Sequence, residues 1–166
     1  MALGSAPSER RSCGMWIDQR GSEILDTPEC VRLLALAAKE DHIGRLAVTD
    51  GQSPLVVPLN FMFYEGEVFV RIGPGGLSDL VPDSLVSSEV DRVETDRAVA
   101  WSVLVRGRAS KAAAGTQYGK AMPKPWVPEP GHIVLSIRPD VVTGRRFHLV
   151  PGISDVKAGA CEMSPV

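Results

Sequence analysis

The chain has 166 residues, of which 44% are hydrophobic and 23% are charged, and its formal net charge at pH 7 is −2. This length suits one domain with its own core, and the composition is that of a soluble globular protein. The slightly negative charge argues against nucleic-acid binding as a main role. The longest apolar run, residues 33–38, is far below the roughly 20 residues of a membrane span. Residues 1–21 also lack the apolar segment of a secretory signal. We therefore expect a cytoplasmic protein that binds neither nucleic acid nor membranes.

Both ends of the chain are small, polar and rich in Gly, Ser or Pro. Residues 1–21 and 150–166 are predicted to be flexible tails on either side of one domain, residues 22–149. That domain opens with a helix predicted over residues 28–40. Thr27 is a suitable N-cap, the next residue is a proline that fits the first helical position, and apolar residues then recur on one face.

After this helix the apolar residues alternate, which is typical of strands. Glu65-Gly66 predicts a tight hairpin turn, and short helices are predicted near residues 78–81 and 116–121. The predicted strands cover residues 42–49, 55–64, 67–72, 85–91, 99–111 and 132–137, and the last resumes over 141–149 after a pause at Pro139-Asp140. Six or seven antiparallel strands with short hairpins favour a mainly β fold that closes into a barrel, because closure removes exposed edges.

The strand at 67–72 leads directly into Gly73-Pro74-Gly75-Gly76. Glycines allow several backbone amides to approach one anion, and the guanidinium of Arg71 adds a fixed positive charge beside them. This pattern predicts a phosphate site. The alternative is an ordinary loop, with Arg71 paired to Glu67 or Glu89.

Pro58 lies in the middle of a predicted strand, where it cannot donate a ladder hydrogen bond. The strand is therefore expected to be an edge or to be bulged there, which exposes Asn60 to the edge of a heterocyclic ligand. Alternatively, Asn60 satisfies local backbone groups. Trp101 and Trp126 are candidates for stacking on a planar ring, or else belong to the core or to a dimer interface.

The strand at 99–111 has two different faces. One face is apolar and is expected to point into the core, whereas the other carries small residues and ends in two arginines. The second face suits a subunit interface or a ligand shelf. Four arginines either converge on a phosphate or carboxylate or are surface residues: Arg106, Arg108, Arg145 and Arg146.

Neither the cysteines nor the histidines have the spacing of metal ligands, and no metal site is predicted. The residues concerned are Cys13, Cys30 and Cys161, expected to be reduced thiols, and His42, His132 and His148, expected to be structural. No nucleophile-base or paired-carboxylate motif is recognisable. If the protein is an enzyme, a bound cofactor must supply the chemistry.

Taken in order, these segments resemble the pyridoxamine 5′-phosphate oxidase-like family of FMN-binding split-barrel proteins, over roughly residues 27–147. The resemblance is carried by HIGRLA at 42–47, VPLNF at 57–61, FVRIGPG at 69–75, WSVLVRGRA at 101–109, PW at 125–126 and VTGRR at 142–146.

The resemblance implies a Greek-key split barrel and a homodimer with two flavin sites at the subunit interface. FMN is the usual ligand in the family, and some relatives use F420, FAD or haem. The residues that the resemblance assigns to the cofactor site are Pro58, Leu59, Asn60, Arg71, Ile72, Gly75, Gly76, Leu77, Trp101, Ser102, Arg106, Trp126 and Arg145.

The phosphate loop departs from the family pattern Arg-Thr-x-x-Gly-Thr-Lys-Leu. Ile72 replaces the first threonine, and Gly76-Leu77 stand where threonine and lysine are expected. The loss of a lysine–phosphate contact costs on the order of 1–3 kcal/mol, roughly a ten- to hundredfold loss of affinity. We expect an FMN-dependent oxidoreductase; the alternatives are an F420-dependent reductase and a non-catalytic protein that binds flavin or haem.

Overall fold

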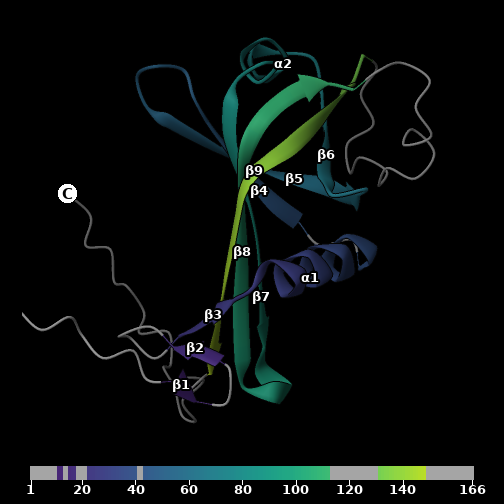
Figure 1. Ribbon diagram of the computed structural model, residues 1–166. Helices are drawn as coiled ribbons and strands as arrows, with labels where there is room; N and C mark the ends of the chain where they lie inside the picture. The colour runs from purple at the N-terminus through teal and green to yellow at the C-terminus, as the bar shows by residue number, and fades with distance from the viewer. Residues whose placement is uncertain (1–10, 13–14, 18–21, 41–42, 113–130, 149–166) are drawn as a thin grey trace, which may run out of the picture.

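The structure is a computed structural model, and it describes residues 11–12, 15–17, 22–40, 43–112 and 131–148. Figure 1 shows the elements. In chain order they are β1 (Arg11–Ser12), β2 (Met15–Ile17), β3 (Glu23–Leu25), α1 (Thr27–Lys39), β4 (Ile43–Thr49), β5 (Pro54–Tyr64), β6 (Glu67–Ile72), α2 (Gly76–Leu80), β7 (Leu85–Glu94), the 3-10 turn η1 (Thr95–Arg97), β8 (Val99–Lys111) and β9 (Ile133–His148).

The strands form one antiparallel sheet in the order β1-β2-β3-β9-β6-β5-β4-β7-β8, and β8 also pairs with β9. Strands β4 to β9 therefore close into a six-stranded barrel, and β1 to β3 extend the sheet beyond β9. The chain runs β4-β5-β6 as a meander and then returns to place β7 beside β4, which is a Greek-key connection. The predicted mainly β, closed antiparallel barrel is confirmed.

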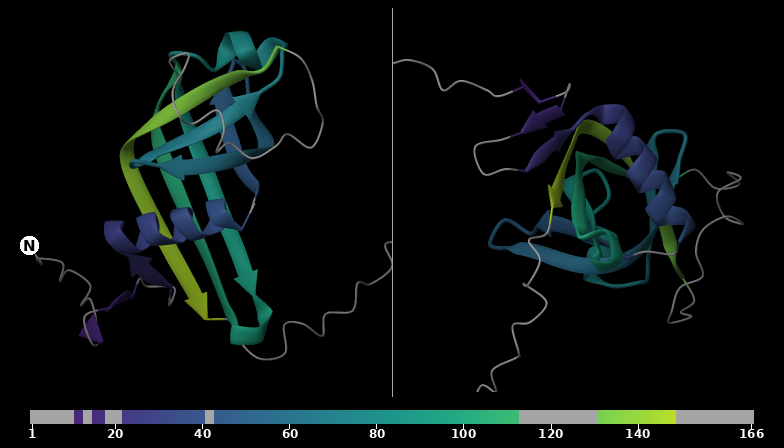
Figure 2. Two further views of the ribbon diagram at one scale, coloured as in Figure 1. Left: turned by 90° about the vertical axis from the view of Figure 1, so that its right-hand side faces the viewer. Right: turned by 90° about the horizontal axis from the view of Figure 1, so that it is seen from below.

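The core fills the barrel and extends under α1, the helix that lies across the barrel strands in Figure 2. Alternate residues of each strand point inward, as with Val103 and Val105 of β8, which are fully buried. Helix α1 packs against β5, β8 and β9, and its buried face includes Leu33, Leu34 and Ala37. The apolar face predicted for the strand at 99–111 is confirmed as the core face.

Two of the predicted elements differ in detail from the structure. The N-cap of α1 is Asp26, not Thr27, because the Asp26 carboxylate accepts a 2.9 Å hydrogen bond from the backbone N–H of Glu29. Strand β9 does not stop at Pro139-Asp140. Arg106 pairs with Val141 and Gly107 with Pro139, so Asp140 is the extra residue of a β-bulge in one continuous strand.

Other elements extend beyond the prediction or lie outside the described residues. β7 continues to Glu94, and the short strands β1 and β2 fall within residues 1–21, where no strand was predicted. The helix predicted at 116–121 lies in the part of the chain that the structure does not describe, as does Trp126. Among the described residues, no helix is both long enough and apolar enough to cross a membrane.

The β4–β5 hairpin explains the mid-strand proline. β5 pairs with β4 over residues 54–60, but it pairs with β6 only over residues 61–64. Pro58 therefore lies where β5 has a neighbour on one side only, and the predicted edge position is confirmed. The far end of the hairpin stands away from the barrel (Figure 1).

Candidate functional site

Arg71 lies on the outer side of the barrel wall, because its neighbours Val70 and Ile72 are buried in the core. Its side chain is partly buried, and it has no hydrogen-bond or ion-pair partner among the described residues. Of the two acidic partners considered from the sequence, Glu89 instead binds Arg45, with Nη1 to Oε2 at 2.9 Å. Arg71 is thus a cation held next to the loop and not neutralised by the described part of the chain.

The loop after Arg71 is shaped by Gly75 and Ser78. Gly75 has a φ of +140°, a conformation that favours glycine. The Ser78 hydroxyl donates to the Gly75 carbonyl at 2.6 Å and accepts from the Gly75 N–H at 3.2 Å. These bonds leave the backbone N–H groups of Gly76 and Leu77 without an acceptor among the described residues. A Cβ added at Gly75 or Gly76 would meet no atom of the described residues within 4 Å, so the described part of the chain leaves the space beside these amides open.

This loop has groups that suit a phosphate, because two backbone amides lack an acceptor among the described residues and Arg71 precedes them by a few residues in the chain. Two of the three residues that depart from the family loop pack in or against the core. Ile72 is 3% exposed and belongs to the core, and Leu77 packs against the core. Neither residue supplies a hydroxyl or ammonium group, so an anion here depends on the backbone and on Arg71.

Asn60 is on the same face of the sheet as Arg71. The last ladder pair between β5 and β6 is Phe61–Val70, and Asn60 and Arg71 are the next residues on each strand, on the same face. The Asn60 side chain is partly buried and has no hydrogen-bond partner among the described residues. Pro58 is exposed, whereas Leu59 packs against the core. We call the group of Asn60, Arg71, Gly76 and Leu77 the loop half-site.

A second group of predicted residues lines a pocket of about 330 Å³ on the outer face of β8 and β9. Ser102 and Arg145 face each other across the two strands, and Leu104 and Thr143 form the next pair. The Arg145 guanidinium donates a 2.9 Å hydrogen bond to the hydroxyl of Ser22. We call this pocket the strand half-site; its lining is Ile24, Ser102, Leu104, Thr143, Gly144 and Arg145.

Leu104, Thr143 and Ile24 were not predicted as site residues. The alternation along β8 could have indicated Leu104, because it shares the face of Ser102. Nothing in the local sequence indicates Ile24, since it reaches the pocket only through the pairing of β3 with β9.

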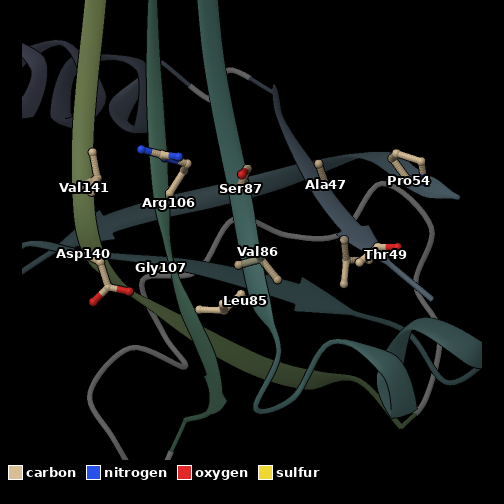
Figure 3. Close-up of a pocket in the computed structure, with 11 residues that line it drawn as sticks. Ala47, Thr49, Pro54, Leu85, Val86, Ser87, Arg106, Gly107, Asp140 and Val141 are labelled. Atoms are coloured by element: carbon tan, nitrogen blue, oxygen red, sulfur yellow. The ribbon is translucent and has the colours of Figure 1, made fainter. Parts of the chain in front are cut away.

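Arg106 does not join the strand half-site. It lies four positions from Ser102 on β8, which is about 13 Å along an extended strand. It lines a separate pocket of about 440 Å³ between the β4–β5 hairpin and strands β7 to β9 (Figure 3). The other arginines also diverge. Arg108 donates to the Asp83 carbonyl, and Arg146 binds Glu23 and Glu29. The four arginines therefore do not converge on one anion.

Trp101 is a core residue. It is 3% exposed, and its indole N–H donates a 3.2 Å hydrogen bond to a carboxylate oxygen of Glu94. The strand alternation that turns Ser102 outward turns Trp101 inward, which is the core position considered for it from the sequence, and its contact with the cofactor stays a prediction. The described residues also include no group of His, Cys, Asp or Glu side chains arranged to hold a metal ion.

The two half-sites are not brought together within one chain. Arg71 pairs with Val134 and Ser102 pairs with Arg145, so eleven residues of β9 (134 to 145) separate the two positions. A strand of this length spans about 35 Å when extended, and β9 also bends sharply along its course (Figure 2). One planar ligand in contact with both half-sites would need each from a different subunit.

Around Arg146 the charges are paired. Its guanidinium lies 3.1 Å from a carboxylate oxygen of Glu23 and also contacts Glu29, which in turn binds Arg32 at 2.7 Å. The hydrogen bond from Arg32, together with Arg146, lowers the pKa of Glu29 from 4.5 to about 2. This cluster joins β3, α1 and β9, and its function is structural.

Comparison with known proteins identifies the family of this chain. Residues 26–146 match the family model for pyridoxamine 5′-phosphate oxidase. The chain is 31% identical over 152 residues to an uncharacterized protein of Mycobacterium tuberculosis, covering 86% of this chain and 95% of the relative.

Solved structures show the same fold. An FAD binding protein from Mycobacterium smegmatis is 27% identical, with a TM-score of 0.64 over 76% of this chain and 99% of the other. A Corynebacterium glutamicum protein is 26% identical, also with a TM-score of 0.64, over 78% and 95% of the two chains. The chain belongs to the pyridoxamine 5′-phosphate oxidase family.

Proposed function

We propose that the protein is a flavin-dependent oxidoreductase that uses FMN, and that two copies of the chain form its cofactor sites. One observation carries the proposal: the loop half-site and the strand half-site suit different parts of a flavin, yet they are separated along β9. In a homodimer with two-fold symmetry, the loop half-site of one subunit faces the strand half-site of the other, twice.

The loop half-site would hold the phosphate. Arg71 would supply charge, and the N–H groups of Gly76 and Leu77 would supply hydrogen bonds. The side-chain amide of Asn60, on the same face as Arg71, would meet the edge of the ring. In the strand half-site, Ser102 and Thr143 offer hydroxyls, while Ile24 and Leu104 offer apolar surface. The pocket volume is near the lower end of the roughly 300–1,000 Å³ typical of small-molecule sites, as expected for half of a shared site.

When bound, the flavin would supply hydride or electron transfer. The residues of this chain would bind and orient it, and closure of the two half-sites over the ring would exclude water. Because the described residues offer no nucleophile-base pair at either half-site, the protein contributes position and electrostatics.

The groups that the loop half-site offers determine which flavin the protein would bind. Without threonine or lysine, the loop half-site offers one guanidinium and two amides, which is enough for a single phosphate at reduced affinity. The Mycobacterium smegmatis relative binds FAD, so FAD is the second candidate for this chain. F420 and haem complete the set to be tested.

The experiment is a parallel titration of the purified protein with FMN, FAD, F420 and haem, followed by absorbance and fluorescence. We expect FMN to bind most tightly. Arg71→Ala should weaken flavin binding about ten- to hundredfold, the loss expected for a charge-assisted contact to phosphate. The matched control is Arg97→Ala, because Arg97 is an exposed arginine on η1, distant in sequence from the loop and paired to Glu94.

The control should bind flavin like the original protein. If Arg71→Ala bound flavin as tightly as the original protein, the loop half-site would not be the site that binds the phosphate. If none of the four ligands bound, the chain would be a member of the family without a cofactor, and the proposal would fail.

A further inference from the structure

Two arginines face each other across β8 and β9. Arg108 and Arg138 are direct cross-strand partners, and both side chains are exposed. Residues that are directly opposite in an antiparallel pair have their Cβ atoms about 4.5–5.5 Å apart on the same face, and like charges in these positions destabilise the sheet. The fold therefore keeps two positive charges close together although they repel each other.

The bulge in β9 produces this arrangement. Ile137 is buried before the bulge and Gly144 is buried after it, so the extra residue Asp140 shifts the alternation of the strand by one. Without this shift, Arg138 would be on the same side as Gly144 and would point into the barrel. Gly107 permits the close approach of the two strands here, because a Cβ on it would lie 1.9 Å from the carbonyl oxygen of Arg138. Bulges of this kind often redirect a side chain next to a functional site.

Neither arginine has a carboxylate partner among the described residues. The neighbouring carboxylates of Asp140 and of Glu67 on β6 form no ion pair with them within the described chain. Nη1 of Arg108 donates a hydrogen bond to the backbone carbonyl of Asp83, which fixes the side chain but does not neutralise its charge. Five other arginines each bind a carboxylate: Arg32, Arg45, Arg92, Arg97 and Arg146.

The arginine pair is separate from both half-sites. Arg71 pairs with Val134, so Arg138 lies four residues further along β9, which is about 13 Å on an extended strand. The strand half-site lies beyond the bulge, and Figure 3 shows β9 turning at Asp140. A single phosphate group could not contact the arginine pair and either half-site at the same time.

We propose that Arg108 and Arg138 form a second anion site, which binds the phosphate group of a small phosphorylated molecule. A phosphate monoester carries a charge of about −1.5 to −2 at neutral pH, which matches two guanidinium groups. Each guanidinium can donate two parallel N–H bonds to phosphate oxygens. A bound phosphate would also offset the repulsion between the two arginines, so binding and stability are linked. This site goes beyond the proposed function and does not depend on the flavin.

The test is a calorimetric titration of the full-length protein with inorganic pyrophosphate at constant ionic strength. The variants are compared in an Arg71→Ala background, because the loop half-site is another place where a phosphate would bind. The background protein should bind pyrophosphate, and Arg138→Gln should weaken this binding at least about tenfold, the loss expected for a charge-assisted contact. Arg138→Gln removes no hydrogen bond within the described chain, so the barrel should fold as before.

The matched control is Arg97→Gln in the same background, which changes the net charge equally at an exposed arginine paired to Glu94. It should bind pyrophosphate like the background protein. Arg108→Gln should resemble Arg138→Gln, although it also removes the hydrogen bond to Asp83. Succinate, a dianion without phosphate, should bind much more weakly than pyrophosphate.

Thermal unfolding at low ionic strength gives a second measurement. Without an anion, Arg138→Gln should raise the unfolding midpoint, because it removes the repulsion between the two arginines. Pyrophosphate should raise the midpoint of the background protein and have little effect on that of the variant. The inference is wrong if the background protein binds no pyrophosphate, if Arg138→Gln leaves the affinity unchanged, or if Arg97→Gln weakens it equally. Succinate that binds as tightly as pyrophosphate would overturn the assignment to phosphate.

Discussion

Arg146 and Arg71 lie on neighbouring strands of the same barrel but in opposite environments. Arg146 is on the side of β9 that faces α1, where the carboxylates of Glu23 and Glu29 neutralise it. Arg71 is on the outer side of β6, with no partner among the described residues, and none of those residues fills the space beside the glycines of the adjacent loop. A partly buried charge that the chain neutralises contributes to the fold, whereas one that it leaves unpaired is available to a ligand.

Arg146→Ala should produce the largest change in stability. Its removal leaves two partly buried carboxylates close to each other with only Arg32 beside them, so we expect the free energy of unfolding to fall by about 2–3 kcal/mol. Flavin affinity should stay within about twofold, since Arg146 lines neither half-site. Urea unfolding and flavin titration measure the two effects. An unchanged unfolding midpoint, or a large loss of flavin affinity, would contradict the assignment of Arg146 to the fold and of Arg71 to ligand binding.

The same cluster predicts a dependence of stability on pH. The pKa of Glu29 is lowered to about 2 in the folded protein, against 4.5 for an unperturbed glutamate. Above pH 4.5 the group is ionised in both states, and the cluster contributes its full stabilisation. As the pH falls from 4.5 towards 2, the unfolded chain binds the proton first, so that stabilisation is lost. The loss attributable to Glu29 should be about 1–2 kcal/mol, because solvent screens this partly exposed group.

Glu29→Gln provides the comparison for this titration. The variant should be less stable at pH 6, and its free energy of unfolding should vary less between pH 6 and pH 2 than that of the original protein. Urea unfolding at several pH values measures both curves. Parallel curves would mean that Glu29 does not carry this pH dependence.

The sequence predicted the barrel well, because its signals are local. Alternation located the six barrel strands, and Glu65-Gly66 located a hairpin whose two turn residues both have positive φ. The bulge at Asp140 was predicted as a break, since a proline and a turn-forming residue resemble a strand end when the neighbouring strand is unknown. The capping error had a similar cause, because Asp26 and Thr27 are both good N-caps and only the backbone distinguishes them.

The site was less predictable, because it depends on contacts between distant strands. Alternation alone placed Trp101 and Ser102 on opposite faces, yet the resemblance assigned both to the cofactor. The separation of Arg71 from Ser102 follows from the pairing of β9 with both β6 and β8, which no local pattern reveals. The roles of Arg145 and Arg146 likewise depend on β3, a three-residue strand that was not predicted.

Two glycines test the contrast between the packed core and the loop half-site with the smallest possible change, the addition of one methyl group. A Cβ at Gly144 would lie 2.6 Å from the Sγ of Cys30 and 3.1 Å from a methyl carbon of Leu25, so the neighbouring core must shift. Gly144→Ala should therefore lower the free energy of unfolding by about 1–3 kcal/mol. It is the matched control for Gly76, whose Cβ would meet no atom of the described part of the chain within 4 Å.

Gly76→Ala should change stability by less than about 0.5 kcal/mol, because Gly76 begins α2 with an ordinary φ and alanine restricts the unfolded chain. The added methyl group would still occupy the space beside the free amides of the loop half-site. A phosphate held there would be pushed away from the N–H groups of Gly76 and Leu77, and flavin affinity should fall several-fold while the unfolding curve remains almost unchanged. Unchanged affinity in Gly76→Ala would show that the loop amides do not contact the cofactor, even if Arg71 does.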